Sequence, residues 1–199
     1  LVASAPDRGI RVVPEFDMPG HSNAWFAAYP QYASAAGPYS VGNGYIGYKG
    51  TFDPTRETVY RFIDGFIGEM SKLFPDAYWH IGGDEVNATQ WKQNARIQKF
   101  MVAHHLADNA ALQAYFNQRL SRILTKHHKH MIGWDEILHP DLPRTTVVQS
   151  WRGTQYLGQA VTQGFSGILA APYYLDAMKS SEQMYLADPL AAGSTLTPD

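Results

Sequence analysis

The chain has 199 residues, and its 16 Lys and Arg nearly balance its 18 Asp and Glu, so the formal net charge is -2. This length suits one domain with one core, and mixed charges exclude the strongly basic surface that binds nucleic acid or anionic membranes. The sequence has no cysteine, no apolar run long enough to span a bilayer, and no signal-peptide pattern in its first residues. We therefore expect no disulfide, no thiolate metal site, no nucleic-acid partner and no membrane span.

Five short runs of β-branched and aromatic residues predict buried strands. They cover residues 10–17, 78–83, 130–136, 145–151 and 166–174. The stretch 32–52, after the first run, is rich in Gly and Tyr and has no periodicity. We expect a loop lying over a site there, because long loops in compact domains are usually functional.

Apolar residues at helical spacing lie between these runs and predict three helices. The first covers residues 53–74 and begins at Asp53 and Pro54, the second covers 112–124, and a shorter third covers 154–164. Alternating strands and helices predict an α/β fold with a parallel sheet covered by helices. Residues 137–144 are the exception, since this proline-rich connection is too short for a full crossover helix.

Polar side chains collect at the C-terminal end of every predicted strand. In chain order they are Glu15, Asp17 and His21; Asp84 and Glu85; Trp134, Asp135 and Glu136; Gln149 and Trp151; Tyr173, Tyr174 and Asp176. The carboxyl ends of parallel strands meet at one rim, where active sites are built. Carboxylates and aromatic rings, without a Gly-rich phosphate loop or an arginine cluster, indicate an uncharged, flat-faced substrate, and a carbohydrate fits best.

The adjacent carboxylates Asp84 and Glu85 can share one site only where the strand ends, which Gly82 and Gly83 permit. Two carboxylates in one pocket raise at least one pKa, which suits Glu85 to general-acid catalysis. An ordinary retaining glycosidase separates its acid and nucleophile by about 5 Å across the scissile bond, which is awkward for sequence neighbours. A substrate that supplies its own nucleophile removes this difficulty. The alternative structural interpretation is that the pair caps the following helix.

Two other functions remain open on the residues alone. A metal-dependent hydrolase could use His21, His80, Asp84 and Glu85, although their spacing matches no zinc motif. A non-catalytic module could use the same rim to bind an N-acetylated sugar without cleaving it.

Several stretches together resemble glycoside hydrolase family 20, the β-N-acetylhexosaminidases. They are "VVPEFDMPGHS", "WHIGGDEV", "LQAYFNQRLSRILTKHHKHMIGWDEIL", "VVQSWRG" and "YYLD", in the order of the family. The resemblance implies a (β/α)8 TIM-barrel catalytic domain, of which residues 1–199 are expected to form one partial domain. It also implies hydrolysis of terminal GlcNAc or GalNAc residues without a metal or other cofactor.

The resemblance further implies a role for each site residue. Glu85 is expected to be the general acid, Asp84 to orient the acetamido group of the substrate, and Tyr174 to hydrogen-bond its oxygen. The expected substrate-binding residues are His21, Trp134, Trp151 and Asp176, and the expected supporting residues are Glu15, Asp17, Asp135 and Glu136, with His21 and Asp17 tuning Glu85.

The five runs are expected to be strands three to seven of the barrel. The first, second and eighth strands, with the arginine and other groups that grip the sugar, would then lie outside this sequence. We therefore expect the isolated chain to be weakly active or inactive and to associate through its exposed barrel edges. Family members usually work outside the cytoplasm or in lysosomes, and the resemblance implies such a location.

Overall fold

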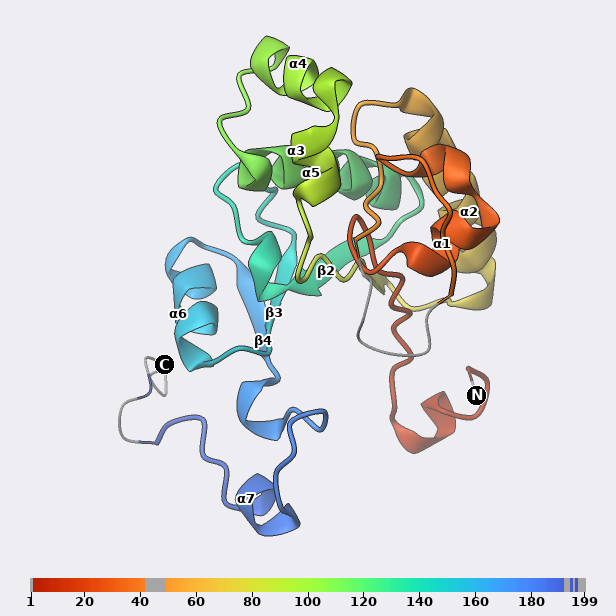
Figure 1. Cartoon of the computed structure of the whole chain (residues 1–199). Coiled ribbons are helices and arrows are strands. Elements are labelled where there is room, and N and C mark those ends of the chain that lie inside the picture. Colours follow the sequence, from red (N-terminus) through yellow and green to blue (C-terminus); the bar gives the residue numbers. More distant parts are fainter. Residues whose placement is uncertain (1, 42–48, 192–193, 195, 197–199) are drawn as a thin grey trace.

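The computed structural model describes residues 2–41, 49–191, 194 and 196, and its centre is a parallel sheet. Four strands pair in the order β1-β2-β3-β4 (Figure 1). They are β1 (Tyr78–His80), β2 (His130–Trp134), β3 (Val147–Ser150) and β4 (Ser166–Leu169). The predicted parallel α/β arrangement is therefore confirmed, although each strand is shorter than its apolar run.

The helices are α1 (Asn23–Ala28), α2 (Glu57–Leu73), α3 (Thr89–Gln93), α4 (Ala95–Ala103), α5 (Asn109–Lys126), α6 (Thr154–Thr162) and α7 (Ser181–Tyr185). Single 3-10 turns cover Pro6–Arg8, Pro30–Tyr32, Asp135–Ile137 and Ala171–Tyr173. In Figure 1, α6 lies at the β4 end of the sheet and α1 and α2 lie at the other end. No helix in the described part of the chain is both long and apolar enough to cross a membrane.

The first predicted strand is much longer than the pairing that the structure shows. Residues 10–17 form no strand, and a single parallel bridge joins Glu15 to His80. The amides of Phe16 and Met18 nevertheless donate to the carbonyls of His80 and Ile81, and the Pro14 carbonyl accepts from the His80 amide. Pro14 has no N–H of its own to donate, so the ladder begins at its carbonyl. This segment lies beside β1 at one edge of the sheet.

The first predicted helix begins later than expected, at Glu57. Asp53 is completely buried and accepts hydrogen bonds from the amide and hydroxyl of Thr55, while Arg56 and Arg96 form ion pairs with it. Its carboxylate therefore holds the turn before the helix instead of capping the first helical turn. The short helices α3 and α4 were not predicted at all.

The core lies between the sheet and the helices that cover it. Helix α5 packs on β2 and on α2, and α6 packs on β3 and β4. The largest buried side chains of this core include Trp79, Phe26, Phe52 and Phe116, each 1% exposed or less. The connection between β2 and β3 has no crossover helix, as predicted, but one 3-10 turn, and the two strands still pair in parallel.

The predicted loop 32–52 is anchored at both ends. Ala33 bridges Phe52, and the Ser34 amide donates to the Thr51 carbonyl. The ring of Tyr39 contacts the ring of Phe26 at 5.2 Å between centroids. Residues 42–48 lie outside the described residues, so the expectation that the loop covers a site stays a prediction.

Candidate active site

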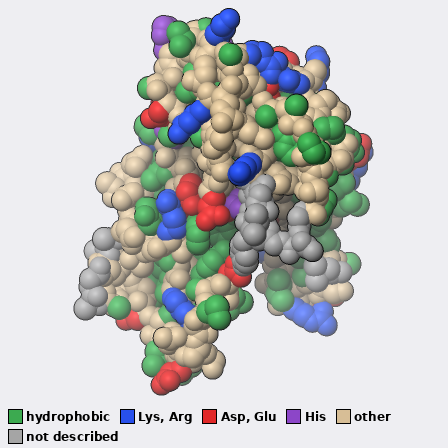
Figure 2. Space-filling view, in the orientation of Figure 1, with side chains coloured by type: hydrophobic (Ala, Val, Ile, Leu, Met, Phe, Trp, Pro, Cys, Tyr) green, Lys and Arg blue, Asp and Glu red, His purple; other side chains and the backbone are tan. Residues whose placement is uncertain are grey.

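The predicted site residues collect at the carboxyl ends of the parallel segments. Figure 2 shows acidic side chains gathered in a hollow at the middle of one face, with a histidine beside them. Trp134 at the end of β2 donates its indole N–H to Glu15 at 2.9 Å, although the two residues lie far apart in the sequence. The rim predicted from strand ends is therefore present in the fold.

The turn that presents Asp84 and Glu85 begins with two glycines in the left-handed region, Gly82 at φ +68° and Gly83 at φ +88°. The Trp134 amide donates to the Gly82 carbonyl at 2.9 Å. On the opposite side, Gln113 of α5 donates its amide N–H to the Gly83 carbonyl at 2.6 Å. Strand β2 and helix α5 thus fix the turn just before the acidic pair. Sequence reasoning missed Gln113, because nothing in a helical pattern marks one polar residue among several.

His21 lies directly against the acidic pair. Its Nε2 is 3.4 Å from Asp84 Oδ2 and 3.3 Å from Glu85 Oε2. His21 and Glu85 both have a positive φ, +50° and +46°, which is uncommon for residues with side chains and concentrates at functional sites. Gly20 makes this approach possible, since a Cβ there would lie 3.3 Å from the backbone of Val86.

The inner part of the site is crowded with carboxyl groups. Burial, together with the negative charges of Glu15 and Asp84, raises the pKa of Asp17 to about 8. Burial likewise raises the pKa of Asp84, although the neighbouring His21 opposes this shift. The structure places Asp17 against Gly82, Glu15 and Asp84, and the expectation that it tunes Glu85 stays a prediction.

The raised pKa of Asp17 predicts that stability falls with pH. Between the ordinary carboxyl pKa of 3.8 and about 8, the folded chain keeps a proton that the unfolded chain releases, so unfolding becomes easier as pH rises. We expect Asp17→Asn to flatten the decline in Tm between pH 5 and 9 by at least about 2 °C, measured by calorimetry. Asp141→Asn at an exposed loop is the control, and parallel curves for wild type and Asp17→Asn would contradict the prediction.

His80 is nearly buried, at 4% exposure, and burial lowers its pKa. Its Nδ1 accepts the Gly82 amide N–H at 3.0 Å, and its ring lies edge-on to Trp134 at 4.9 Å. Among the described residues, His21, Asp84 and Glu85 bring metal-ligating atoms within 4.8 Å of one another, and His80 is not part of this group. The four-ligand metal site considered from sequence is therefore reduced to three residues.

Aromatic rings form a wall next to the carboxyl groups. The ring of Tyr174 lies 6.0 Å from that of Trp134 and 5.5 Å from that of Trp151, between centroids. A cavity of about 610 Å³ opens beside Trp151 and Tyr174 and extends to Arg152 and Lys179. Burial raises the pKa of Tyr174, and the charge of Asp176 adds to this shift. Tyr174 therefore keeps its hydroxyl proton and can donate a hydrogen bond.

Asp135 and Glu136 hold the loop that carries Trp151. Asp135, buried at 3% exposure, accepts the backbone amides of Trp151 at 3.1 Å and Arg152 at 3.3 Å, and forms an ion pair with the Arg152 guanidinium. Glu136 accepts the indole N–H of Trp151 at 3.1 Å, and burial raises its pKa to about 7. Both residues support the aromatic wall, whereas Asp176 is exposed at its outer end.

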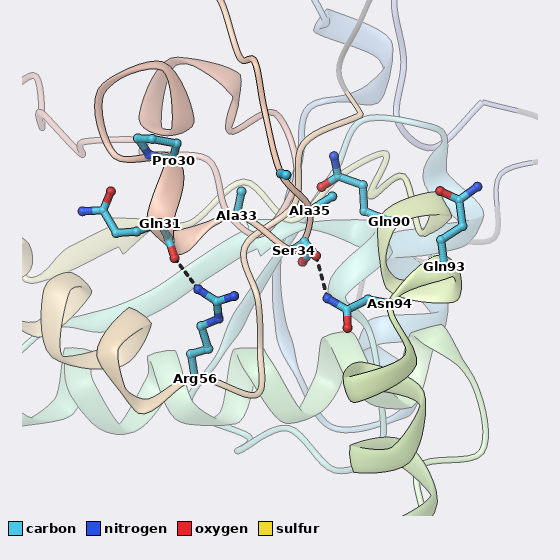
Figure 3. Close-up of a pocket in the computed structure, with 10 residues that line it drawn as sticks. Pro30, Gln31, Ala33, Ser34, Ala35, Arg56, Gln90, Gln93 and Asn94 are labelled. Carbon is cyan, nitrogen blue, oxygen red and sulfur yellow. Dashed lines mark hydrogen bonds between the residues drawn. The ribbon is translucent and has the colours of Figure 1, made fainter.

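Another cavity, of about 500 Å³, lies between residues 30–36 and helix α3 (Figure 3). Its polar groups are used for structure: Asn94 donates to the Ser34 carbonyl and Arg56 to the Gln31 carbonyl. None of the predicted site residues lines it. The carboxyl and aromatic rim is therefore the better candidate for catalysis.

Comparisons with known proteins identify the family of this chain. The catalytic-domain model of glycosyl hydrolase family 20 matches residues 1–192. The beta-hexosaminidase subunit alpha of Rattus norvegicus is 37% identical in an alignment 203 residues long, which covers 94% of this chain and 37% of that protein. The chitobiase of Flavobacterium johnsoniae superposes with a TM-score of 0.92 at 38% identity, over 99% of this chain and 31% of that one.

A further structural match is the exo β-N-acetylglucosaminidase of Vibrio harveyi, solved in complex with N-acetylglucosamine. It has a TM-score of 0.80 at 27% identity, over 99% of this chain and 34% of that one. A parallel α/β sheet with carboxyl and aromatic groups at its rim defines part of a barrel-type glycoside hydrolase domain. The chain belongs to glycosyl hydrolase family 20 and spans about a third of the length of these relatives.

Proposed function

We propose that this chain carries the general acid and the acetamide-binding wall of a β-N-acetylhexosaminidase that removes terminal N-acetylhexosamine residues. One observation carries the proposal: the pair Asp84 and Glu85 faces His21 and lies at the same rim as an aromatic wall with an un-ionised tyrosine. A sugar ring can stack on such a wall while its polar groups meet the carboxyl groups.

In the proposed mechanism Glu85 donates a proton to the glycosidic oxygen as the bond from that oxygen to C1 breaks. The carbonyl oxygen of the substrate's own acetamido group forms a bond to C1, which gives an oxazolinium ion and the free alcohol. Deprotonated Glu85 then takes a proton from water, whose oxygen attacks C1 and restores the acetamido group with retained configuration.

The other residues stabilise charge and hold the substrate in this proposal. Asp84 accepts the acetamido N–H and stabilises the positive charge that develops on the ring nitrogen. Tyr174 donates its hydroxyl proton toward the acetamido oxygen, which becomes partly charged during attack. Trp134 and Trp151 enclose the acetamido methyl group, and Asp176 accepts a hydrogen bond from a sugar hydroxyl.

The organisation and location of the protein belong to the same proposal. We infer that residues 1–199 form one part of a barrel domain and cover its strands three to seven. Strand β4 has exposed residues along most of its length and lies at the sheet edge, which supports self-association or pairing with further strands. A location outside the cytoplasm and independence from any cofactor rest on the family resemblance and stay proposals.

The test compares two chromogenic substrates that differ only at C2. A nitrophenyl N-acetyl-β-glucosaminide can form the oxazolinium ion, and the matching β-glucoside cannot. We expect hydrolysis of the first substrate alone by a longer protein that joins this chain to the remaining barrel strands, and little or none by the 199 residues alone. Equal hydrolysis of both substrates would overturn the substrate-assisted mechanism, and turnover by the 199 residues would overturn the need for further strands.

A non-catalytic sugar-binding module is the second candidate, because the aromatic wall alone could hold an N-acetylated sugar. Calorimetric titration with N-acetylglucosamine distinguishes the two functions. Binding of the sugar by a protein that hydrolyses neither substrate would favour the binding module over the hydrolase.

Gln113 is expected to act as a positioning residue in this reaction. Gln113→Leu removes the hydrogen bond to the Gly83 carbonyl, so we expect kcat to fall about tenfold or more while KM changes little, because misplacement of the acid affects the transition state most. Gln118→Leu is the matched control, since Gln118 of the same helix donates to the Asp141 carbonyl at 3.0 Å, in the β2–β3 connection. Equal effects of both variants on kcat would show that Gln113 only stabilises the fold.

A further inference from the structure

His21, Asp84 and Glu85 have the composition and spacing of a three-residue metal site. Each offers one ligand atom, and these atoms lie within 4.8 Å of one another. The residues come from two segments, the turn after Gly20 and the turn after Gly83, which are packed backbone against backbone. The fold therefore holds the backbone of these two turns side by side.

The distances agree with tetrahedral coordination. A zinc ion bound to nitrogen and oxygen at roughly 2.0–2.1 Å places neighbouring ligand atoms about 3.3–3.4 Å apart. The distances from His21 Nε2 are 3.4 Å to Asp84 Oδ2 and 3.3 Å to Glu85 Oε2. The third edge joins the two carboxylates, whose ligand atoms lie within 4.8 Å of each other.

The electrostatics of the site also favour a cation. In the described part of the chain, the ion pairs recorded for Asp84 and Glu85 are with His21. Glu15 adds a further negative charge beside Asp84, and among the described residues no Lys or Arg forms an ion pair with Glu15, Asp84 or Glu85. A divalent cation would relieve this concentration of negative charge.

We propose that His21, Asp84 and Glu85 bind one Zn²⁺ ion, and that the bound ion blocks the site instead of assisting the reaction. One imidazole nitrogen and two carboxylate oxygens suit Zn²⁺, Cu²⁺ and Ni²⁺ better than Mg²⁺ or Ca²⁺, which prefer oxygen ligands alone. The inhibitory consequence rests on the proposed function, because a metal-bound Glu85 carboxylate has no proton to give to a leaving group. The binding itself does not depend on that function.

The binding test uses calorimetric titration of the untagged 199-residue chain with ZnCl₂, beside Glu85→Gln, His21→Gln and the control His139→Gln. We expect one ion per chain, at least about tenfold weaker binding in the first two variants, and unchanged binding in the control. Glu85 is exposed, so Glu85→Gln keeps the test valid even if His21→Gln fails to fold. Equal zinc affinity in all four proteins, or Mg²⁺ binding as tight as Zn²⁺, overturns the proposal.

A second readout reports the geometry at the metal. Co²⁺ absorbs visible light much more strongly in a tetrahedral than in an octahedral site, and we expect the strong spectrum in wild type and its loss in Glu85→Gln. A weak octahedral spectrum in wild type would contradict the site. With the longer protein, zinc should compete with the N-acetyl substrate and a chelator should restore activity. If the longer protein binds zinc but hydrolyses neither substrate, even with a chelator present, the metal site is supported and the proposed function is rejected.

Discussion

Glu85→Gln is expected to lower kcat for hydrolysis of an N-acetyl-β-glucosaminide by about 10²- to 10⁴-fold, the usual contribution of a positioned general acid. The amide has nearly the shape of the carboxyl group but cannot donate a proton to the leaving oxygen or accept one from water. The measurement is steady-state kinetics on the longer barrel protein described above. The exposure of the Glu85 side chain, 59%, predicts that the fold is unaffected.

The size of this loss should depend on the leaving group. A nitrophenolate leaves readily without protonation, whereas the hydroxyl of a second sugar does not, so we expect a larger loss with a disaccharide than with the chromogenic substrate. Glu69→Gln on the exposed face of α2 is the matched control and should have no effect on either substrate. A uniform loss with both substrates would argue against Glu85 as the acid.

The parallel sheet and the rim of the site could be predicted because they depend on local patterns. Near-continuous apolar runs indicate buried parallel strands, and such strands place their following residues at one edge. The contacts within that rim could not be predicted. The approach of His21 to Glu85 depends on two residues with positive φ and on Gly20 lying against a distant backbone, and no local pattern encodes that packing.

The errors have similar causes. The first predicted strand was too long, because hydrophobic periodicity ignores the missing N–H of Pro14, and the residues before it pair with no strand in the described part of the chain. Asp53 was placed at a helix start by its residue type, yet it is buried and paired with Arg96, a residue 43 positions away. Gln113 was missed for the same reason, since its importance lies in a tertiary contact with Gly83.

Gly82→Ala is expected to destabilise the fold by about 2–5 kcal/mol, the sum of a left-handed alanine and a steric conflict in a packed site. Gly82 has a φ of +68°, and a Cβ there would overlap Asp17 Oδ1 and lie 2.8 Å from Asp17 Cγ and 3.0 Å from Asp17 Cα. Because the last of these is a backbone atom, side-chain rotation alone cannot remove the conflict. The whole 14–18 segment would have to move away from β1, and His21 would move with it.

Gly65→Ala is the matched control, since Gly65 lies inside α2 and an added Cβ there would contact nothing within 4 Å. Alanine at that helical position should stabilise the chain by about 0.5–1 kcal/mol. Chemical unfolding of both variants measures the change in the free energy of unfolding, which is expected to be a decrease for Gly82→Ala and an increase for Gly65→Ala. If Gly82→Ala were as stable as wild type, the tight packing of the first segment against the glycine turn would be refuted. The link between that packing and the placement of His21 beside Glu85 would then fail with it.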